Sequence, residues 1–384
     1  MKRTASVQFF CHFIWTRRTA TAYSDKGDPI GEGDNVRNVV GILLDRKTYL
    51  GIPSQQTGYE RIDLYNKAAK KLGMTPFYMC LSQISGKSSL GFLYENNKYR
   101  LVRLSLPKVT HNRAMSLTSY LKKKLSDLSR TSKVFNEQNR YDKLHIYKLL
   151  ETQESVKAYL PLSMAYSPKR LVKAMSHYSS LFIKPTNSSI GKGVIQLTRE
   201  DDENWQLCWS NKKPAVVSEK KAIAIICEKV GSQKYMIQRA IALATDRGRP
   251  YDLRVSVQRG DEGKWQVNGI AGKVAAAGRH VTNLAKGGEA RHCEDLFRSS
   301  GFDPAQMKKS IEQTSLLIVE SLARRIPQVA DVGLDIGVDD QGRIGLIEVN
   351  CRDQRYEFKE LKMNESFYKT YETPMKYAKY LMKK

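Results

Sequence analysis

Two carboxylates and an amide stand close together in LDIGVDDQGRIGLIEVN, residues 334–350. Strand side chains alternate between the two faces of a sheet, so a hairpin turn at Gln341-Gly342 would place Asp335 across from Glu348. Asn350 shares the face of Glu348 by the same alternation. Facing carboxylates repel one another unless a cation joins them, and oxygen ligands suit Mg²⁺. The segment therefore predicts a Mg²⁺ site, with a solvated or arginine-paired acidic face as the alternative. The other face would be apolar and would pack in the core: Leu334, Ile336, Val338, Ile347 and Val349.

A lysine and a glycine-rich loop follow one another in FIKPTNSSIGKGVIQL, residues 182–197. Lys184 ends a predicted strand. Glycines let backbone N–H groups approach phosphate oxygens, and lysine adds a positive charge, so the loop could bind phosphate. It is not a P-loop, because GxxxxGK[ST] is absent and a strand follows, and an ordinary turn is the alternative. The loop residues of interest are Ser188, Ser189, Gly191, Lys192 and Gly193.

A third group of residues could bind an anionic substrate. In YDLRVSVQR, residues 251–259, Asp252 and Arg254 share one strand face, and arginine can hold a carboxylate or phosphate with two parallel hydrogen bonds. The later stretch GRHVTNLAKGGEA adds Arg279, Thr282, Asn283 and a glycine pair. Taken singly, a surface arginine and an ordinary loop remain alternatives.

The elements that position these residues indicate a mixed α+β and α/β architecture. Residues 1–36 read as a flexible extension rich in polar residues. Between 37 and 125, a strand, a helix over 57–74, a second strand and a hairpin predict a small α/β domain. Residues 126–384 form the main domain, in which the candidate residues lie on strands. It closes with a basic helix over 368–384.

Composition restricts the kind of partner. The chain has 384 residues, 41% of them hydrophobic, enough for more than one domain. Its 64 basic residues outnumber 39 acidic ones, and the formal charge of +25 favours an acidic substrate, a cell-wall polyanion or a nucleic acid. A solvated basic surface is the alternative. The six cysteines form no CxxC pair, as in a reducing cytoplasm. No apolar run approaches the roughly 20 residues of a membrane helix, so we expect a cytoplasmic protein without a membrane partner.

The order of the motifs resembles the ATP-grasp superfamily. It runs from Asp142-Lys143-Leu144 through LPLSMAYSP, FIKPTNSSIGKGV, YMIQRAI, DLRV and TNLAKGG to LDIGV…LIEVN. Within the superfamily the chain is most similar to the YheC/YheD family, whose members are described as endospore coat-associated, and more distantly to RimK-type ligases. The resemblance implies an ATP-grasp fold, in which two α+β subdomains clamp ATP, and a possible association with spores.

The resemblance also implies a role for each group of residues. Lys143 and Lys184 would contact the ATP phosphates, and the loop 187–193 would close over them. A hinge segment would border the adenine through its backbone. Arg254, Lys273 and Asn283 would face the γ-phosphate and the acyl end of the substrate, while Asp335, Glu348 and Asn350 would hold one or two Mg²⁺ ions. The hinge consists of Gln238, Arg239, Ala240 and Ile241.

Three positions depart from RimK-type ligases. Arg239 stands where those enzymes usually carry an acidic residue, so the resemblance does not extend to the ribose contact. Lys273 occupies an expected arginine position. After Asn350 comes CRDQR in place of SSPG. We therefore expect the edge of the site that borders the substrate to differ from that of RimK-type ligases.

The implied activity is that of an ATP-dependent carboxylate–amine ligase. The carboxylate of an amino acid, peptide or acidic polymer would attack the γ-phosphate to give an acyl phosphate and ADP, and an amine would then displace phosphate. Positioned cations would catalyse such a transfer without a protein nucleophile. Two alternatives remain: an ATP-grasp phosphotransferase that stops at the phosphorylated product, and a non-catalytic spore-coat or polyanion-binding protein.

Overall fold

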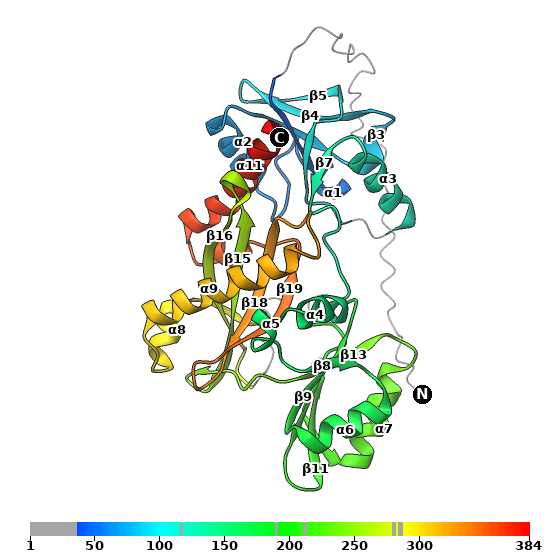
Figure 1. Cartoon of the computed structure of the whole chain (residues 1–384), viewed down its shortest axis with the longest axis vertical. Helices are drawn as coiled ribbons and strands as arrows, with labels where there is room; N and C mark the ends of the chain where they lie inside the picture. Colours follow the sequence, from blue (N-terminus) through cyan, green and yellow to red (C-terminus); the bar gives the residue numbers. More distant parts are fainter. Residues whose placement is uncertain (1–36, 116–117, 189–190, 210–212, 279–281, 283–286) are drawn as a thin grey trace, which may run out of the picture.

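A computed structural model of the chain describes residues 37–115, 118–188, 191–209, 213–278, 282 and 287–384. Within these residues the chain builds three sheets covered by helices (Figure 1), which is the mixed α and β architecture that the sequence predicts. The predicted extension 1–36 and the candidate residues Ser189, Arg279 and Asn283 lie outside the described residues. Among the described helices, none combines the length and the apolar character that crossing a bilayer requires.

The first sheet is built around parallel strands of the amino-terminal part. The strand VVGIL is buried along most of its length, as expected for a central parallel strand with both faces covered. In spatial order the sheet contains β3 (Ile84–Ser85), β4 (Ser88–Glu95), β2 (Thr75–Met79), β1 (Val39–Leu43), β6 (Val109–Asn112) and β7 (Lys133–Phe135), with β5 (Lys98–Ser105) paired to β4. Its helices are α1 (Arg46–Leu50), α2 (Ile62–Lys71) and α3 (Ser119–Ser129).

The second sheet is antiparallel and carries the glycine-rich loop. Helix α6 (Pro168–His177) begins with proline in its first turn, and the Ser167 side chain accepts a hydrogen bond from the Arg170 backbone N–H, two features that start a helix. Helices α6 and α7 (Glu219–Val230) share a core with this sheet. Its strands, in spatial order, are β12 (Ala215–Ser218), β11 (Asn204–Trp209), β10 (Ile195–Arg199), β9 (Ser180–Pro185), β13 (Tyr235–Arg239) and β8 (Ser163–Ala165).

The third sheet carries the predicted hairpin and the arginine strand. Helix α9 (Pro304–Ala323) covers it and shares the largest core with it. In spatial order its strands are β17 (Glu289–His292), β16 (Trp265–Val274), β15 (Arg249–Arg259), β18 (Asp331–Val338) and β19 (Ile344–Asn350), with β14 (Thr245–Asp246) beside β15. The remaining helices are α4 (Lys143–Glu151), α5 (Glu154–Lys157), α8 (Cys293–Ser299), α10 (Tyr356–Glu360) and α11 (Asn364–Lys383).

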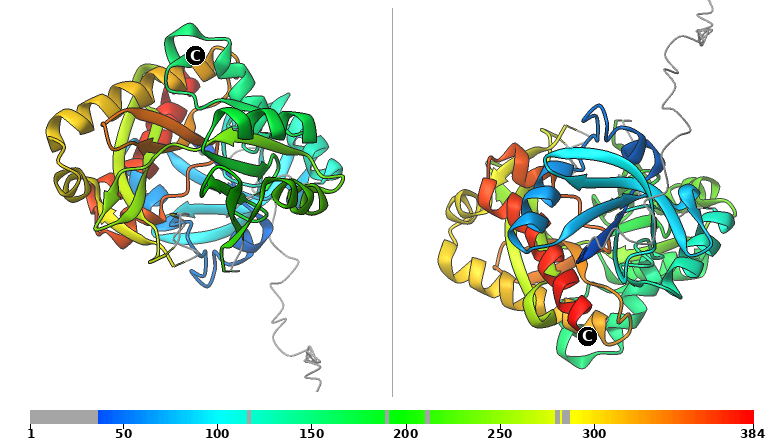
Figure 2. Two further views of the ribbon diagram at one scale, coloured as in Figure 1. Left: turned by 90° about the horizontal axis from the view of Figure 1, so that it is seen from below. Right: turned by 90° about the horizontal axis from the view of Figure 1, so that it is seen from above.

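The carboxyl-terminal helix packs against both the first and the third sheets. Tyr371 and Met375 of α11 belong to the same buried cluster as Val40 and Tyr65, and α11 runs alongside α2 (Figure 2). Helix α3 and strand β7 also belong to this region, so the predicted boundary at residue 125 falls inside α3. The chain therefore returns at its end to complete the core that its first strands begin.

A buried set of charges joins the first and third sheets. Asp331 of β18 accepts hydrogen bonds from Arg113 at 2.9 Å and from Arg355 at 2.8 Å, and His111 of β6 lies 3.2 Å from the same oxygen. Arg113 also contacts Glu60, just before α2, at 3.1 Å. Because every member is buried and paired, the set fixes how the two sheets meet.

Candidate nucleotide and metal site

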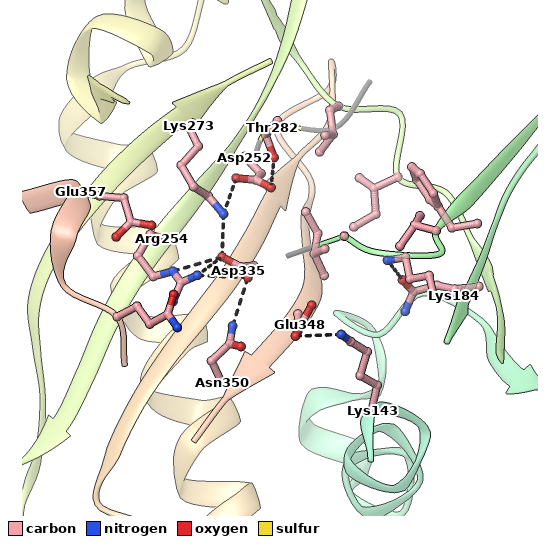
Figure 3. A pocket seen from close by; sticks show the side chains of 18 of the residues that line it. Lys143, Lys184, Asp252, Arg254, Lys273, Thr282, Asp335, Glu348, Asn350 and Glu357 are labelled. Atoms are coloured by element: carbon pink, nitrogen blue, oxygen red, sulfur yellow. Dashed lines mark hydrogen bonds and ion pairs between the residues drawn. The ribbon is translucent and has the colours of Figure 1, made fainter. Parts of the chain in front are cut away.

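A cavity between the second and third sheets collects most of the predicted residues (Figure 3). One wall comes from α4, β9, β13 and the loop after β9. The other comes from β15, β16, β18 and β19, together with residues 354–357. Among the described residues its lining is Lys143, Phe182, Lys184, Gly191, Val194, Gln238, Arg239, Ile241, Leu243, Asp252, Arg254, Lys273, Thr282, Asp335, Ile347, Glu348, Asn350, Gln354, Tyr356 and Glu357.

The predicted pairing of Asp335 with Glu348 is present in the hairpin of β18 and β19. The turn alone does not produce it, because Val338 pairs with Ile344 beside the turn and the register shifts between Asp335 and its neighbour. A bulge in β19 supplies the extra residue and restores the pairing. The correct pair was therefore predicted from a turn whose register is displaced by one residue.

The bulge also changes which side chains face the core. Leu334, Ile336 and Val338 are buried, as predicted, and Val349 packs against the same core cluster. The prediction for Ile347 was wrong: it lines the cavity beside Glu348, because the extra residue breaks the alternation of faces. This places an apolar side chain next to the candidate metal ligands.

Cationic side chains of the protein are paired with both carboxylates. Lys273 Nζ lies 2.7 Å and Arg254 Nη2 lies 3.1 Å from Asp335 Oδ1, and Lys143 Nζ lies 3.1 Å from Glu348 Oε1. The sequence left open an arginine-paired acidic face as the alternative to a metal site, and in this structure arginine and lysine side chains neutralise both carboxylates. The metal site stays a prediction. Burial alone would raise the pKa of Asp335, but Arg254 and Lys273 hold it at about 2.

Arg254 is held between two acidic side chains. Its Nε donates to Asp335 at 3.1 Å, and its Nη1 lies 3.6 Å from the fully buried carboxylate of Asp353. Gly333 leaves room for this contact, because a Cβ there would lie 2.5 Å from Asp353 Oδ1 and 2.7 Å from Arg254 Nη1. The Arg254 guanidinium is thus fixed in orientation, and its Nε and Nη2, the two donors of the arginine fork, are directed at Asp335.

Lys273 joins Asp335 to a third carboxylate. Its Nζ lies 3.0 Å from Asp252 Oδ1, and the Thr282 hydroxyl donates to the other oxygen of Asp252. Burial alone would lower the pKa of Lys273, but Asp252 and Asp335 raise it above its usual value. Lys273 therefore stays charged at neutral pH.

The two lysines of the opposite wall differ in environment. Lys143 at the start of α4 donates to the Ser188 carbonyl at 2.8 Å besides contacting Glu348. Lys184 on β9 donates to Gln238 Oε1 at 2.6 Å. Burial lowers the pKa of Lys184 to about 8, and the charge of Lys143 adds to this effect. A bound anion would raise the pKa of Lys184 again.

The glycine-rich loop reaches the cavity at one described position. Gly191 lines the cavity, whereas Ser188, Lys192 and Gly193 do not belong to its described lining. The Ser188 hydroxyl instead donates to the Lys192 carbonyl at 3.0 Å. Gly193 has a φ of +78°, and a Cβ there would lie 2.8 Å from Pro185, so glycine is required for the turn itself.

The hinge segment borders two cavities. Gln238, Arg239 and Ile241 line the site, and Ala240 lines an adjoining cavity that also contains Arg239 and Ile241. Gln238 is buried and bridges Lys184 to the Ser163 hydroxyl, to which its Nε2 donates at 3.0 Å. Its side chain therefore positions Lys184, and the backbone of the segment remains the part that a nucleotide base could contact.

The donor set at Asp335, Glu348 and Asn350 is suited to Mg²⁺. No group of three or more His, Cys, Asp or Glu that could hold a metal occurs among the described residues, but Mg²⁺ typically takes one or two carboxylates and shares substrate phosphates. The Asn350 amide nitrogen donates to Asp335 Oδ2 at 3.1 Å. Its oxygen is therefore the atom left as a ligand.

Several lining residues have no role in the set that the resemblance implies. Asp252 and Thr282 belong to the group that the sequence indicates for an anionic substrate, and both line the cavity. Residues after Asn350 gave only the indication that the substrate edge would differ. The structure places three of them on the cavity: Gln354, Tyr356 and Glu357.

Solved ATP-grasp ligases have the same fold as this chain, which therefore has an ATP-grasp fold. The D-cycloserine synthetase DcsG matches with a TM-score of 0.52 at 10% identity, covering 88% of this chain and all of that one (100%). D-alanyl-alanine synthetase A from Vibrio cholerae matches at 0.50 and 13%, covering 91% and 100%. The ATP-grasp ligase PsnB, solved with a minimal precursor, Mg and ADP, matches at 0.51 and 11%, covering 90% and 98%.

Sequence comparison gives the particular family. A family model described as YheC/D-like ATP-grasp matches residues 131–381, and the chain belongs to this family. Two Bacillus subtilis (strain 168) proteins are similar to it. The endospore coat-associated protein YheD is 26% identical over 77% of this chain and 67% of its own length. The endospore coat-associated protein YheC is 22% identical over 62% and 67%.

Proposed function

We propose that the protein is a carboxylate–amine ligase that uses ATP with Mg²⁺. The supporting observation is the arrangement around Asp335 and Glu348. Two carboxylates and the Asn350 amide share one wall of a cavity that also contains the cations Lys143, Lys184, Arg254 and Lys273. Such a set neutralises phosphate oxygens and binds metal, which phosphoryl transfer requires more than a protein nucleophile.

Different residues of the chain would hold different parts of the nucleotide. The backbone of Gln238–Ile241 and the apolar side chains of Phe182 and Ile347 would hold the base, while Lys143 and Lys184 would hold the phosphates. Asp335, Glu348 and Asn350 would hold Mg²⁺, which neutralises charge on the phosphates when bound. Lys143, Lys273 and Arg254 would then exchange their carboxylate partners for phosphate and substrate oxygens.

The reaction would proceed in two steps, formation of an acyl phosphate and its attack by the amine. A carboxylate oxygen of the substrate attacks the γ-phosphorus, and ADP leaves with the electrons of the broken P–O bond. The amine nitrogen then attacks the acyl carbon, phosphate leaves, and the nitrogen loses a proton. Arg254 and Lys273 would hold the carboxylate in line with the phosphate.

A screen for ADP release tests the proposal. The protein is incubated with ATP and Mg²⁺ across amino acids, peptides and cell-wall fragments, and products are analysed by mass spectrometry. Release of ADP and phosphate with a new amide is expected. A stable phosphorylated product would instead indicate a phosphotransferase, and no stimulation of ADP release by any carboxylate, with unchanged acids recovered, would contradict the proposal.

The place of action follows from the cosubstrate. ATP is supplied in the cytoplasm, so we propose that the reaction takes place there, and the similarity to endospore coat-associated relatives makes sporulating cells a suitable setting. Fractionation of such cells, with detection of the chain in the soluble fraction before coat assembly, is the expected result. Recovery in the assembled coat alone would contradict it.

A further inference from the structure

Glu357 is a buried carboxylate on the cavity wall that the proposed reaction does not use. It lies in the first turn of α10 and lines the cavity with its neighbour Tyr356 (Figure 3). Its side chain is fully buried, at 0% exposure. Neither carboxylate oxygen accepts a hydrogen bond from another described residue.

The other acidic residues of the cavity have partners. Asp335 is bound by Arg254 and Lys273, Asp252 by Lys273 and Thr282, and Glu348 by Lys143. No described residue lies within ion-pair distance of Glu357, although Arg254 is its neighbour in space. The nearby cations are paired with other carboxylates, so among the described residues the Glu357 carboxylate has no ion-pair partner.

An unpartnered buried carboxylate is costly, and leucine or glutamine would fill the same space at lower cost. Burial raises the pKa of Glu357, while the positive charges of Arg254 and Lys273 oppose the rise. A ligand in the cavity that donates hydrogen bonds to the Glu357 carboxylate would offset this cost. The donor that best matches a carboxylate is an ammonium group, with up to three N–H bonds.

We infer that Glu357 binds an ammonium group of the substrate, so that the ligase takes an amine-bearing acid or a primary amine at this end of the cavity. The inference rests on the proposed function. A cationic fork at Arg254 and an anionic group at Glu357 on neighbouring elements match the two charges of a zwitterionic amino acid. Two sources of ammonium fit this chemistry: the amino group of the acid that is activated, and the amine that attacks it.

Binding measurements with simple probes test the assignment. The full chain, with Mg²⁺ and the ATP analogue AMPPNP, is titrated calorimetrically with alanine, with glycinamide, which lacks the carboxylate, and with propionate, which lacks the amine. The near-isosteric E357Q variant is compared with E360Q, a matched control, because Glu360 is an exposed carboxylate on the same helix.

E357Q should weaken alanine or glycinamide binding by roughly tenfold or more, the worth of a charged hydrogen bond, and leave propionate unchanged. E360Q should bind all three probes as the wild type does. E357D, which keeps the charge at shorter reach, should retain part of the affinity. Equal binding of the amine probes by E357Q and wild type, or no binding of either amine probe by the wild type, would overturn the inference.

Trapping with hydroxylamine separates the two sources of ammonium. Hydroxylamine converts an acyl phosphate into a hydroxamate without an amine site. If Glu357 holds the attacking amine, E357Q keeps hydroxamate formation and loses amide formation. If it holds the amino group of the acid, E357Q loses hydroxamate formation with amino acids and keeps it with the corresponding des-amino acids. A wild type that binds the amine probes but forms neither product would count against the ligase proposal and not against Glu357.

Discussion

Asp335 and Glu348 face one another across β18 and β19, and each is paired with cations from a different wall of the cavity. Asp335 is bound by Arg254 and Lys273 of its own sheet, whereas Glu348 is bound by Lys143 of α4 on the opposite wall. If Mg²⁺ binds here as proposed, it competes with these protein cations for the carboxylate oxygens. A displaced cation would be free to contact phosphate, so we expect Mg²⁺ and nucleotide to bind cooperatively.

Replacing Glu348 separates metal binding from stability. The Glu348–Lys143 pair is partly exposed, at 32% and 15%, so Glu348→Gln should change the free energy of unfolding by less than about 1 kcal/mol. It should nevertheless weaken Mg²⁺-dependent AMPPNP binding roughly ten- to hundredfold, as loss of a metal-site partner does. Urea unfolding and calorimetry measure the two effects. Wild-type nucleotide affinity at limiting Mg²⁺ would remove Glu348 from the metal site.

Nucleotide affinity should depend on pH through Lys184. Burial lowers the pKa of this lysine to about 8, so its charge is present at pH 7 and is lost as pH rises through 8. AMPPNP affinity should therefore fall roughly tenfold between pH 7 and 9. Lys184→Arg should show little of this fall, because arginine remains charged. Lys184→Ala should fold but bind AMPPNP poorly. Parallel pH profiles for the wild type and Lys184→Arg would show that Lys184 does not contact phosphate.

Arg254→Lys tests the value of the arginine fork. Lysine keeps the charge but cannot contact Asp335 and Asp353 together, so one buried carboxylate loses its partner. We expect a destabilisation of about 1–3 kcal/mol and a greater loss in use of the carboxylate substrate than in AMPPNP affinity. Denaturant titration and kinetic constants for both substrates measure this. An equal loss for nucleotide and substrate would indicate a purely structural role.

Asp353 should make stability depend on pH. Burial raises its pKa to about 7, although Arg254 opposes the rise. Because the folded state then holds this proton more tightly than the unfolded state, the contribution of Asp353 is present below roughly pH 4 and is lost as pH rises to 7. Between pH 5 and 8 the wild type should lose stability relative to Asp353→Asn. Unfolding curves at several pH values provide the comparison, and a constant difference would contradict the direction given.

Removal of any one side chain from the charged set between the first and third sheets should destabilise the protein. Asp331→Asn leaves Arg113 and Arg355 buried without their common partner, and removal of one partner from a buried ion pair costs about 3–5 kcal/mol. Asp340→Asn is the control, because Asp340 lies exposed at the far end of the same hairpin. Thermal unfolding measures both variants. Equal melting temperatures would mean that the sheets are held together by apolar packing alone.

An assumed turn at Gln341-Gly342 predicted that Asp335 lies across from Glu348. The pair is correct because the bulge in β19 offsets the one-residue displacement of the register at the turn. The bulge that turns Ile347 into the cavity has no local sign in IGLIEVN, since it depends on how β19 packs. Periodicity likewise gave the strands that carry Lys184 and Arg254.

Pairings between distant segments could not be predicted from the sequence. Lys143 meets Glu348 and Arg113 meets Asp331 only because separate sheets pack together. Glu357 follows a segment for which the family resemblance supplied no role, and its burial comes from the packing of α10. The sequence patterns report which faces are apolar, but not which charged side chains the assembled faces bring together.

The packing of α11 on α2 has a consequence for synthesis of the chain. Arg61 beside α2 hydrogen-bonds Tyr371 of α11 across 310 positions of sequence, and the two helices share one core. At about 5–20 residues per second, a ribosome needs roughly 15–60 s to travel between these positions. During that time the first sheet has emerged with part of its apolar surface uncovered. We therefore expect this core to close only after translation has passed α11, which makes the nascent amino-terminal region a substrate for chaperones.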